Sequence, residues 1–261
     1  MRTHIQAVQD QFDPQAQAYL VSPVHAAGPD LAAARERVAR DLAPTARILD
    51  VGCGAGHLSF ALAPAVGAVV ALDPAPAMLA TVRQAAASRG LPQIETIEGS
   101  ADALPFAAAS FDLVCTRYSA HHWFDLPGAL GEMRRVVKPD GFMLVIDLLG
   151  EDVALVDTHL QSIELLRDTS HVRDRTGAEW GSLLQHAGFE RIELRSWPTR
   201  LEFTPWIQRM RTTAALVTAI RVLQAGAPAE VQRALAIEAD GSFTARTGLF
   251  WAHAGGLASG P

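Results

Sequence analysis

Apolar residues along this chain gather in short runs that alternate with stretches of helical spacing. The runs predict strands at about residues 47–51, 68–72, 94–98, 111–116 and 141–148. Between most of them, helical spacing predicts helices near residues 57–64, 76–88 and 128–137. This alternation predicts a doubly wound α/β fold, a mostly parallel sheet with helices on both faces. Ligand-binding loops then lie at the carboxyl ends of the strands.

The segments that flank this core are mainly helical. Residues 12–42 and 151–167 predict helices, and a further helix over 178–187 ends at a glycine. The charged segment 171–175 between the last two of these helices predicts a solvated loop. A sixth strand is expected at 191–197, and a further apolar segment lies at 249–253. In the roughly fifty residues between these two segments, positions from Trp206 to Gln224 follow helical spacing and predict one long helix across the mouth of the sheet.

Length and charge limit the classes of function. With 261 residues, 49% of them hydrophobic, the chain can fill the core of one sizeable domain. A net charge of −6 argues against nucleic acid as a partner, because phosphate binding needs clustered Lys and Arg. No apolar stretch approaches about 18 residues, and the first residues lack a signal-peptide pattern. We therefore expect a soluble, cytoplasmic protein with no membrane partner, as a monomer or homodimer.

The two cysteines and the basic residues add little about function. Cys53 and Cys115 show no metal-ligand spacing, so we expect buried thiols in a reducing compartment and no metal site. Lys138 is the only lysine among 22 basic residues. The preference for arginine, together with abundant alanine, is typical of a GC-rich bacterial genome.

A glycine-rich segment follows the first predicted strand and opens a helix. It reads Asp50-Val51-Gly52-Cys53-Gly54-Ala55-Gly56-His57. Glycines between a strand and a helix let the backbone turn sharply and approach a ligand closely, with free N–H groups at the helix start. A dinucleotide-binding loop has G-x-G-x-x-G spacing, whose third glycine would fall at His57. Here the spacing is G-x-G-x-G, so the loop predicts a nucleotide-type ligand other than a dinucleotide.

An acidic residue ends the second predicted strand. Asp73 follows the apolar run at 69–72. At this position a carboxylate can accept hydrogen bonds from both hydroxyl groups of a ribose.

Three further segments complete a recognisable pattern: Ile94–Gly99, Ser100–Phe106 and Ser110–Val114. Together with the glycine loop and Asp73 they resemble class I S-adenosylmethionine-dependent methyltransferases (EC 2.1.1). The branch is methyltransferase type 11, which includes ubiquinone and menaquinone C-methyltransferases and many small-molecule O- and N-methyltransferases. The resemblance covers about residues 45–150. It implies a Rossmann-like, seven-stranded sheet with an antiparallel last strand, a helical N-terminal lid and a helical insertion between the last two strands.

The resemblance also divides the chain and assigns its cofactor, S-adenosyl-L-methionine, which leaves as S-adenosyl-L-homocysteine. The expected regions are 1–45, a helical lid; 46–200, the cofactor-binding core; 201–246, a helical insertion over the acceptor site; and 247–261, the last strand and tail. Candidate cofactor residues are Tyr19, Asp50, Gly52, Cys53, Gly54, Gly56, Asp73, Pro74, Met78, Ser100, Ala101, Asp102 and Arg117.

The resemblance gives several of these residues a role. Asp50 is expected near the methionine ammonium group and Asp73 at the ribose diol, while Pro74 and Met78 pack on adenine. Relatives carry an acid where this chain has Ser100, so adenine is held by a neutral acceptor, the Ala101 backbone and apolar packing. Asp102 either compensates or is a solvated charge.

Catalytic candidates follow the fourth and fifth predicted strands. The segment 117–125 contains His121 and His122, and Asp147 lies in the fifth strand. A methyl acceptor that carries a proton needs a base, and histidine suits this role because its pKa lies near neutral pH. In related sugar O-methyltransferases one histidine of such a pair is proposed to act with an acid after the fifth strand. Either histidine is therefore a candidate general base, and a structural role for both remains the alternative.

The acceptor is less well defined. Aromatic and methionine side chains suit a flat aromatic or quinone-like metabolite, attacked at oxygen or nitrogen if a histidine is the base. Two alternatives stay open: a C-methyltransferase of quinone biosynthesis, and a non-catalytic cofactor-binding module. The residues expected around the acceptor are Trp123, Phe203, Trp206, Met210 and Trp251.

Overall fold

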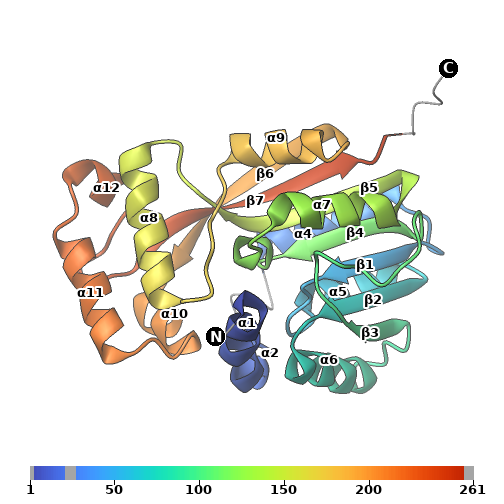
Figure 1. Cartoon of the computed structure of the whole chain (residues 1–261), viewed down its shortest axis with the longest axis horizontal. Coiled ribbons are helices and arrows are strands. Elements are labelled where there is room, and N and C mark those ends of the chain that lie inside the picture. Colours follow the sequence, from blue (N-terminus) through green and yellow to red (C-terminus); the bar gives the residue numbers. More distant parts are fainter. Residues whose placement is uncertain (1–2, 21–27, 256–261) are drawn as a thin grey trace.

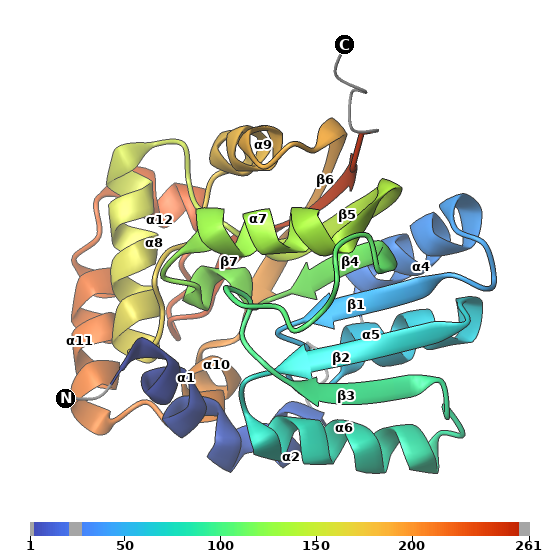
Figure 2. The same ribbon diagram turned by 45° about the vertical axis from the view of Figure 1, so that its right-hand side comes forward.

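The computed structural model describes residues 3–20 and 28–255, and the tail from residue 256 lies outside this range. Seven strands form one sheet in the order β3-β2-β1-β4-β5-β7-β6 (Figure 2). The strand β7 runs antiparallel to both of its neighbours, β5 and β6, and all other neighbouring strands are parallel. The strands are β1 Arg47–Val51, β2 Ala68–Asp73, β3 Ile94–Glu98, β4 Phe111–Arg117, β5 Val137–Leu149, β6 Glu190–Leu201 and β7 Phe243–His253. The expected seven-stranded methyltransferase architecture is confirmed.

Helices cover both faces of this sheet. Buried residues of α4 (Pro29–Asp41), α5 (His57–Leu62) and α6 (Pro76–Ser88) pack against one face. Those of α7 (Leu126–Val136) and α9 (Gly177–His186) pack against the other. The central strands β1, β2 and β4 are almost wholly buried, because in a parallel sheet both faces meet helices.

The N-terminal helices α1 (His4–Phe12) and α2 (Ala16–Leu20) lie beside the carboxyl ends of the strands (Figures 1 and 2). Thr3 and Gln6 start α1 with a capping box. No residue of α1 is fully buried. The helix therefore lies over the rest of the molecule as a cover and not as part of its core.

The far end of the sheet extends into a second helical layer, at the left of Figure 1. Here α8 (Ala154–Arg167), α10 (Phe203–Arg209), α11 (Ala214–Ala225) and α12 (Ala229–Ala234) pack with the ends of β6 and β7 around their own apolar cluster. The single long helix expected between the last strands is therefore wrong. Arg211, with φ of +51°, interrupts the helix after α10, and Gly226 and Pro228 separate α11 from α12.

The last three strands are longer than their apolar runs. The strands β5, β6 and β7 extend beyond the expected 141–148, 191–197 and 249–253, because β6 and β7 pair in one ladder from Glu193 to Leu201. This ladder carries charged residues on its solvent side, which hides it from a search for apolar runs. Within the described ranges, no helix is long and apolar enough to cross a membrane.

Candidate active site

The order of the strands reverses beside β1, which pairs with β2 on one side and β4 on the other. At such a switch point the loops diverge and leave room for a ligand. A cavity of about 1170 Å³, part of it open to solvent, lies at the carboxyl ends of these strands. We call it the first cavity. Its size suits a ligand of nucleoside dimensions.

Twelve of the thirteen candidate cofactor residues line this first cavity: Tyr19, Asp50, Gly52, Cys53, Gly54, Asp73, Pro74, Met78, Ser100, Ala101, Asp102 and Arg117. Gly56 does not, although its φ is +86°. A Cβ at Gly56 would meet Phe60 and Val82 at 2.9 Å. The glycine is thus needed for packing within the protein and not for contact with a ligand.

The other two loop glycines differ from each other in what a side chain would meet. A Cβ on Gly52 would overlap the Ser119 hydroxyl group, so this position is restricted by the chain itself. A Cβ on Gly54 has no atom of residues 3–20 or 28–255 within 4 Å and would extend into open space. Of the three glycines, only Gly54 leaves space that a ligand can use.

Two buried carboxylates give this cavity its polar character. Asp73 accepts hydrogen bonds from the backbone N–H of Gly54 (2.8 Å) and of Ala75 (2.9 Å). A carboxylate offers about four acceptor positions, so two remain for further donors. Asp50 accepts from the Ser59 hydroxyl at 2.7 Å, while its Oδ1 has no hydrogen-bond partner within the described chain. Burial raises the pKa of each acid to about 6.

These observations fit S-adenosylmethionine. The partnerless Oδ1 of Asp50 suits an ammonium group, because a buried carboxylate oxygen without a donor is costly. The free acceptor positions of Asp73 suit a ribose diol. Nearby, the Ser100 hydroxyl donates to Asp102, which leaves the serine oxygen lone pairs to accept from an adenine amino group.

Arg117 and Cys53 have mainly structural surroundings. The Arg117 Nε lies 2.6 Å from Asp30 Oδ2 in a buried ion pair that connects α4 to the end of β4. The guanidinium group also stacks on the ring of Tyr118 at 4.6 Å. Cys53 and Cys115 are both buried, as expected, and burial raises the pKa of each thiol.

The histidine pair follows β4 in the short helix η3 (Ala120–His122), and its two rings lie 4.2 Å apart. His121 Nδ1 is 2.6 Å from Asp147 Oδ1, and the backbone N–H of His121 donates to Asp147 Oδ2 at 3.1 Å. Burial disfavours the charged ring, but the charge of Asp147 and this hydrogen bond outweigh it and raise the pKa of His121 to about 9. His121 is therefore a cation at neutral pH.

His122 has the opposite character. Burial, followed by the positive charge of His121, lowers the pKa of His122 to about 4. Its Nδ1 lies 3.2 Å from the carbonyl oxygen of Ser170, which can only accept, so the neutral ring carries its proton on Nδ1. Nε2 is then left as an acceptor, with Asp168 Oδ2 3.9 Å away.

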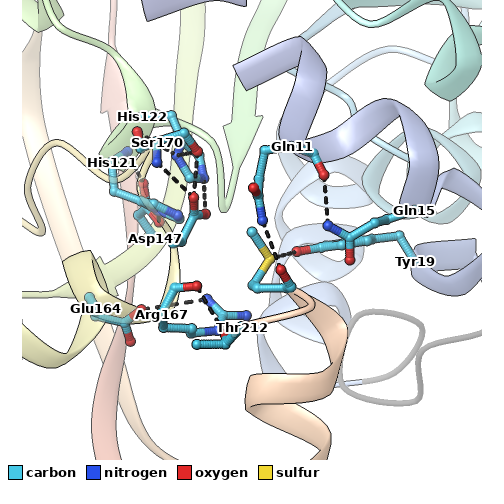
Figure 3. Close-up of polar contacts among 12 residues, drawn as sticks. Gln11, Gln15, Tyr19, His121, His122, Asp147, Glu164, Arg167, Ser170 and Thr212 are labelled. Atoms are coloured by element: carbon cyan, nitrogen blue, oxygen red, sulfur yellow. Dashed lines mark hydrogen bonds and ion pairs between the residues drawn. The ribbon is translucent and has the colours of Figure 1, made fainter. Parts of the chain in front are cut away.

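A second cavity adjoins the first, and Phe12, Tyr19, Tyr118 and His122 line both. It encloses about 610 Å³, part of it open to solvent. His121 lines the second cavity and is not among the residues that line the first. In Figure 3 the histidine pair lies on one side, Tyr19 on the other, and Glu164 and Arg167 from α8 below.

The sequence did not identify most residues of the second cavity. Residues 171–175 were expected to form a solvated loop, which is wrong, because His171 and Asp174 are 7% and 2% exposed. The loop is drawn inward by hydrogen bonds from Val172 N to the His121 carbonyl (2.8 Å) and from Asp174 N to Gln161 (3.1 Å). Such hydrogen-bond partners cannot be predicted from the local sequence, because they lie far away along the chain.

The aromatic residues expected around the acceptor are also dispersed. Trp123 lines the first cavity and Trp206 the second. Phe203, Met210 and Trp251 are buried and line neither. Within the described residues, no group of three or more His, Cys, Asp or Glu side chains is arranged to hold a metal ion.

Comparison with known proteins places these features in context. The methyltransferase domain family matches residues 49–145. YafE of Escherichia coli is 44% identical over 202 residues, which cover 77% of this chain and 98% of that protein. The methyltransferase YcgJ of Bacillus subtilis is 32% identical over 168 residues, 64% of this chain and 66% of that protein. Its crystal structure superposes with a TM-score of 0.81 and covers 86% of this chain and 97% of that one, at 27% identity. The demethylmenaquinone methyltransferase of Thermus thermophilus is 42% identical over 103 residues, 39% of this chain and 46% of that protein.

Proposed function

The chain belongs to the class I S-adenosylmethionine-dependent methyltransferases, and on that premise we propose that it methylates an oxygen or nitrogen atom of a small metabolite. Asp50, Gly54 and Asp73 would hold S-adenosylmethionine in the first cavity. When bound, this cofactor supplies a methyl group on a positively charged sulfur, already activated for transfer. The acceptor would occupy the second cavity, and S-adenosylhomocysteine would be the second product.

The unequal histidine pair carries this proposal. His122 lines both cavities, is neutral at physiological pH and carries an acceptor nitrogen at Nε2. It is therefore suited to remove the proton of a hydroxyl or amino group as that group attacks. His121 and Asp147 act differently: they form a charged pair beside it, and the positive charge of His121 adds to burial in keeping His122 neutral.

A second candidate function is C-methylation of a quinone precursor. The similarity to demethylmenaquinone methyltransferases supports it, but that similarity covers only 39% of this chain. The charged lining of that cavity favours a polar acceptor over a lipid-tailed quinone. We retain the expectation of a cytoplasmic enzyme that acts as a monomer or homodimer.

The proposal is tested first by calorimetry with S-adenosylmethionine and NAD side by side, and then by a metabolite screen for the mass gain of one methyl group. His122→Ala should keep its affinity for S-adenosylmethionine and lose at least about 10²-fold in turnover. Wild-type turnover in both His122→Ala and His121→Ala would contradict the assignment of a histidine as general base. Binding of the cofactor without transfer to any acceptor would instead favour a non-catalytic module.

A further inference from the structure

The second cavity combines an apolar wall with an unusual concentration of buried charge. Phe12, Leu148, Leu201 and Trp206 supply apolar surface, while Arg167 and Arg209 approach from the ends of α8 and α10. An apolar wall with a few charged groups is the usual composition of a site that orients a small ligand. The charges therefore indicate which polar groups that ligand carries.

The acidic residues of this cavity are largely satisfied by the chain itself. Asp168 Oδ1 accepts from the backbone N–H of Ser170 (2.9 Å) and from its hydroxyl group (2.6 Å). Glu164 Oε2 lies 3.5 Å from Arg167 Nη1. Burial raises the pKa of Asp174, which favours its neutral form. Asp168 is thus the acid that keeps a negative charge in this cavity, with its Oδ1 held by Ser170, while Glu164 is paired with Arg167.

The basic residues are less well satisfied. Arg167 donates from Nε to the Trp206 carbonyl at 3.0 Å and has Glu164 beside it. Arg209 has neither kind of support: its buried Nε has no hydrogen-bond partner, and among residues 3–20 and 28–255 no carboxylate forms an ion pair with its guanidinium group. The Tyr19 hydroxyl interacts with both arginines but cannot neutralise them. His121 is also positive, but Asp147 pairs with it at 2.6 Å, so it does not add an unpaired charge.

A partly buried guanidinium group without an anionic partner is costly unless a ligand supplies that partner. Arginine also presents several N–H donors in a fork that matches the two oxygens of a carboxylate. The apolar wall suits the body of such a ligand. The neutral His122 at the boundary with the first cavity suits its nucleophilic hydroxyl or amino group.

We propose that the methyl acceptor is a small carboxylic acid with an apolar body, whose carboxylate binds Arg209 with support from Arg167. This proposal rests on the assignment of the second cavity to the acceptor. It narrows the substrate class to acids that carry a hydroxyl or amino group apart from the carboxylate. Neutral quinones and amines are excluded from it.

The experiment measures binding of benzoate and of its neutral analogue benzamide to the full chain saturated with S-adenosylhomocysteine, by ligand-observed NMR titration. Benzoate should bind at least about tenfold more tightly than benzamide, because a charge-assisted hydrogen bond contributes about 1.5–3 kcal/mol. Arg209→Gln should weaken benzoate binding about ten- to hundredfold. Arg233→Gln, on the exposed side of α12, is the matched control and should leave it unchanged.

The proposal is overturned if benzamide binds as tightly as benzoate, if Arg209→Gln binds benzoate like the wild type, or if benzoate shows no saturable binding. Retained binding of S-adenosylhomocysteine by Arg209→Gln would show that the variant is folded. Absence of that binding in the wild type would contradict the proposed function itself. The same titration on the protein without S-adenosylhomocysteine then still tests the carboxylate site.

Discussion

The two cavities share a boundary but are built in different ways. The polar groups of the first cavity come largely from two adjacent strand ends, since Asp50 lies near the end of β1, Gly54 follows that strand, and Asp73 ends β2. The second cavity is assembled from side chains of α1, α2, η3, α8 and α10, of β5 and β6, and of the loops after β4 and α8. The first therefore depends on local backbone geometry, whereas the second depends on how distant elements pack. This difference separates the part of the molecule that defines the family from the part that we propose selects a substrate.

The sharpest test of the backbone-built first cavity is Gly54→Val. Its side chain would enter the space expected for the cofactor, so binding of S-adenosylmethionine should become unmeasurable by calorimetry. Gly90→Val is a matched control, because Gly90 also has a positive φ (+66°), open space around its Cβ position, and no place in either cavity. Equal loss of binding in both variants would attribute the effect to backbone strain.

In the second cavity, the His121–Asp147 pair should make stability depend on pH. The folded protein raises the pKa of His121 from 6.5 to about 9, so the pair stabilises it fully below pH 6.5 and ceases to as pH rises through 9. The effect is at most about 3 kcal/mol. Urea unfolding should show the advantage of the wild type over Asp147→Asn shrinking between pH 6.5 and pH 10. A difference that does not change with pH would contradict a charged pair.

A smaller effect is expected from Asp73→Asn in the first cavity. The amide NH₂ group would face the N–H donor of Gly54 or Ala75, so that hydrogen bond would be lost. The diol would also lose a charged acceptor. The Kd for S-adenosylmethionine should rise about ten- to hundredfold, measured by calorimetry. Asp112→Asn, whose carboxylate is paired with Lys138 outside both cavities, should bind like the wild type.

The smallest expected effect concerns the boundary between the cavities. With the pKa of His122 at about 4 and that of His121 at about 9, turnover at saturating S-adenosylmethionine should change less than about twofold between pH 5.5 and 7.5, for an acceptor that does not itself titrate there. A histidine base with an unperturbed pKa near 6.5 would increase turnover about tenfold over this range. A pH–rate profile with a step near 6.5 would contradict the assignment of His122.

The comparison also explains what the sequence could predict. The first five strands, the glycine turn and Asp73 follow from short-range patterns, because a strand end and the turn after it lie within a few residues of each other. The full length of β6 and β7 does not, because the ladder that they share carries charged residues. Arg209 lies on a helix that a continuous pattern joined to α11, and the left-handed Arg211 that separates them has no marker in the sequence. The sequence around Asp174 predicted a solvated loop, because the residue is charged and its partner Gln161 lies 13 positions earlier, in α8.

The histidine–acid pairing lies between these cases. Adjacent strand ends bring η3 close to Asp147, so a meeting of one histidine with this acid follows from topology. Which histidine meets it depends on the turn of η3, which directs His121 to Asp147 and His122 to Ser170. The sequence alone does not show this choice.

The N-terminal helix reaches both cavities through few attachments. His4 contacts the His122 carbonyl oxygen, Gln9 donates to Pro74, and Gln11 donates to the Met210 carbonyl, while the ring of Phe12 packs on that of His122. The helix α1 thus covers both cavities. A movement of α1 that admits the acceptor to the second cavity would also expose S-adenosylhomocysteine in the first, so acceptor entry and product release would share one movement.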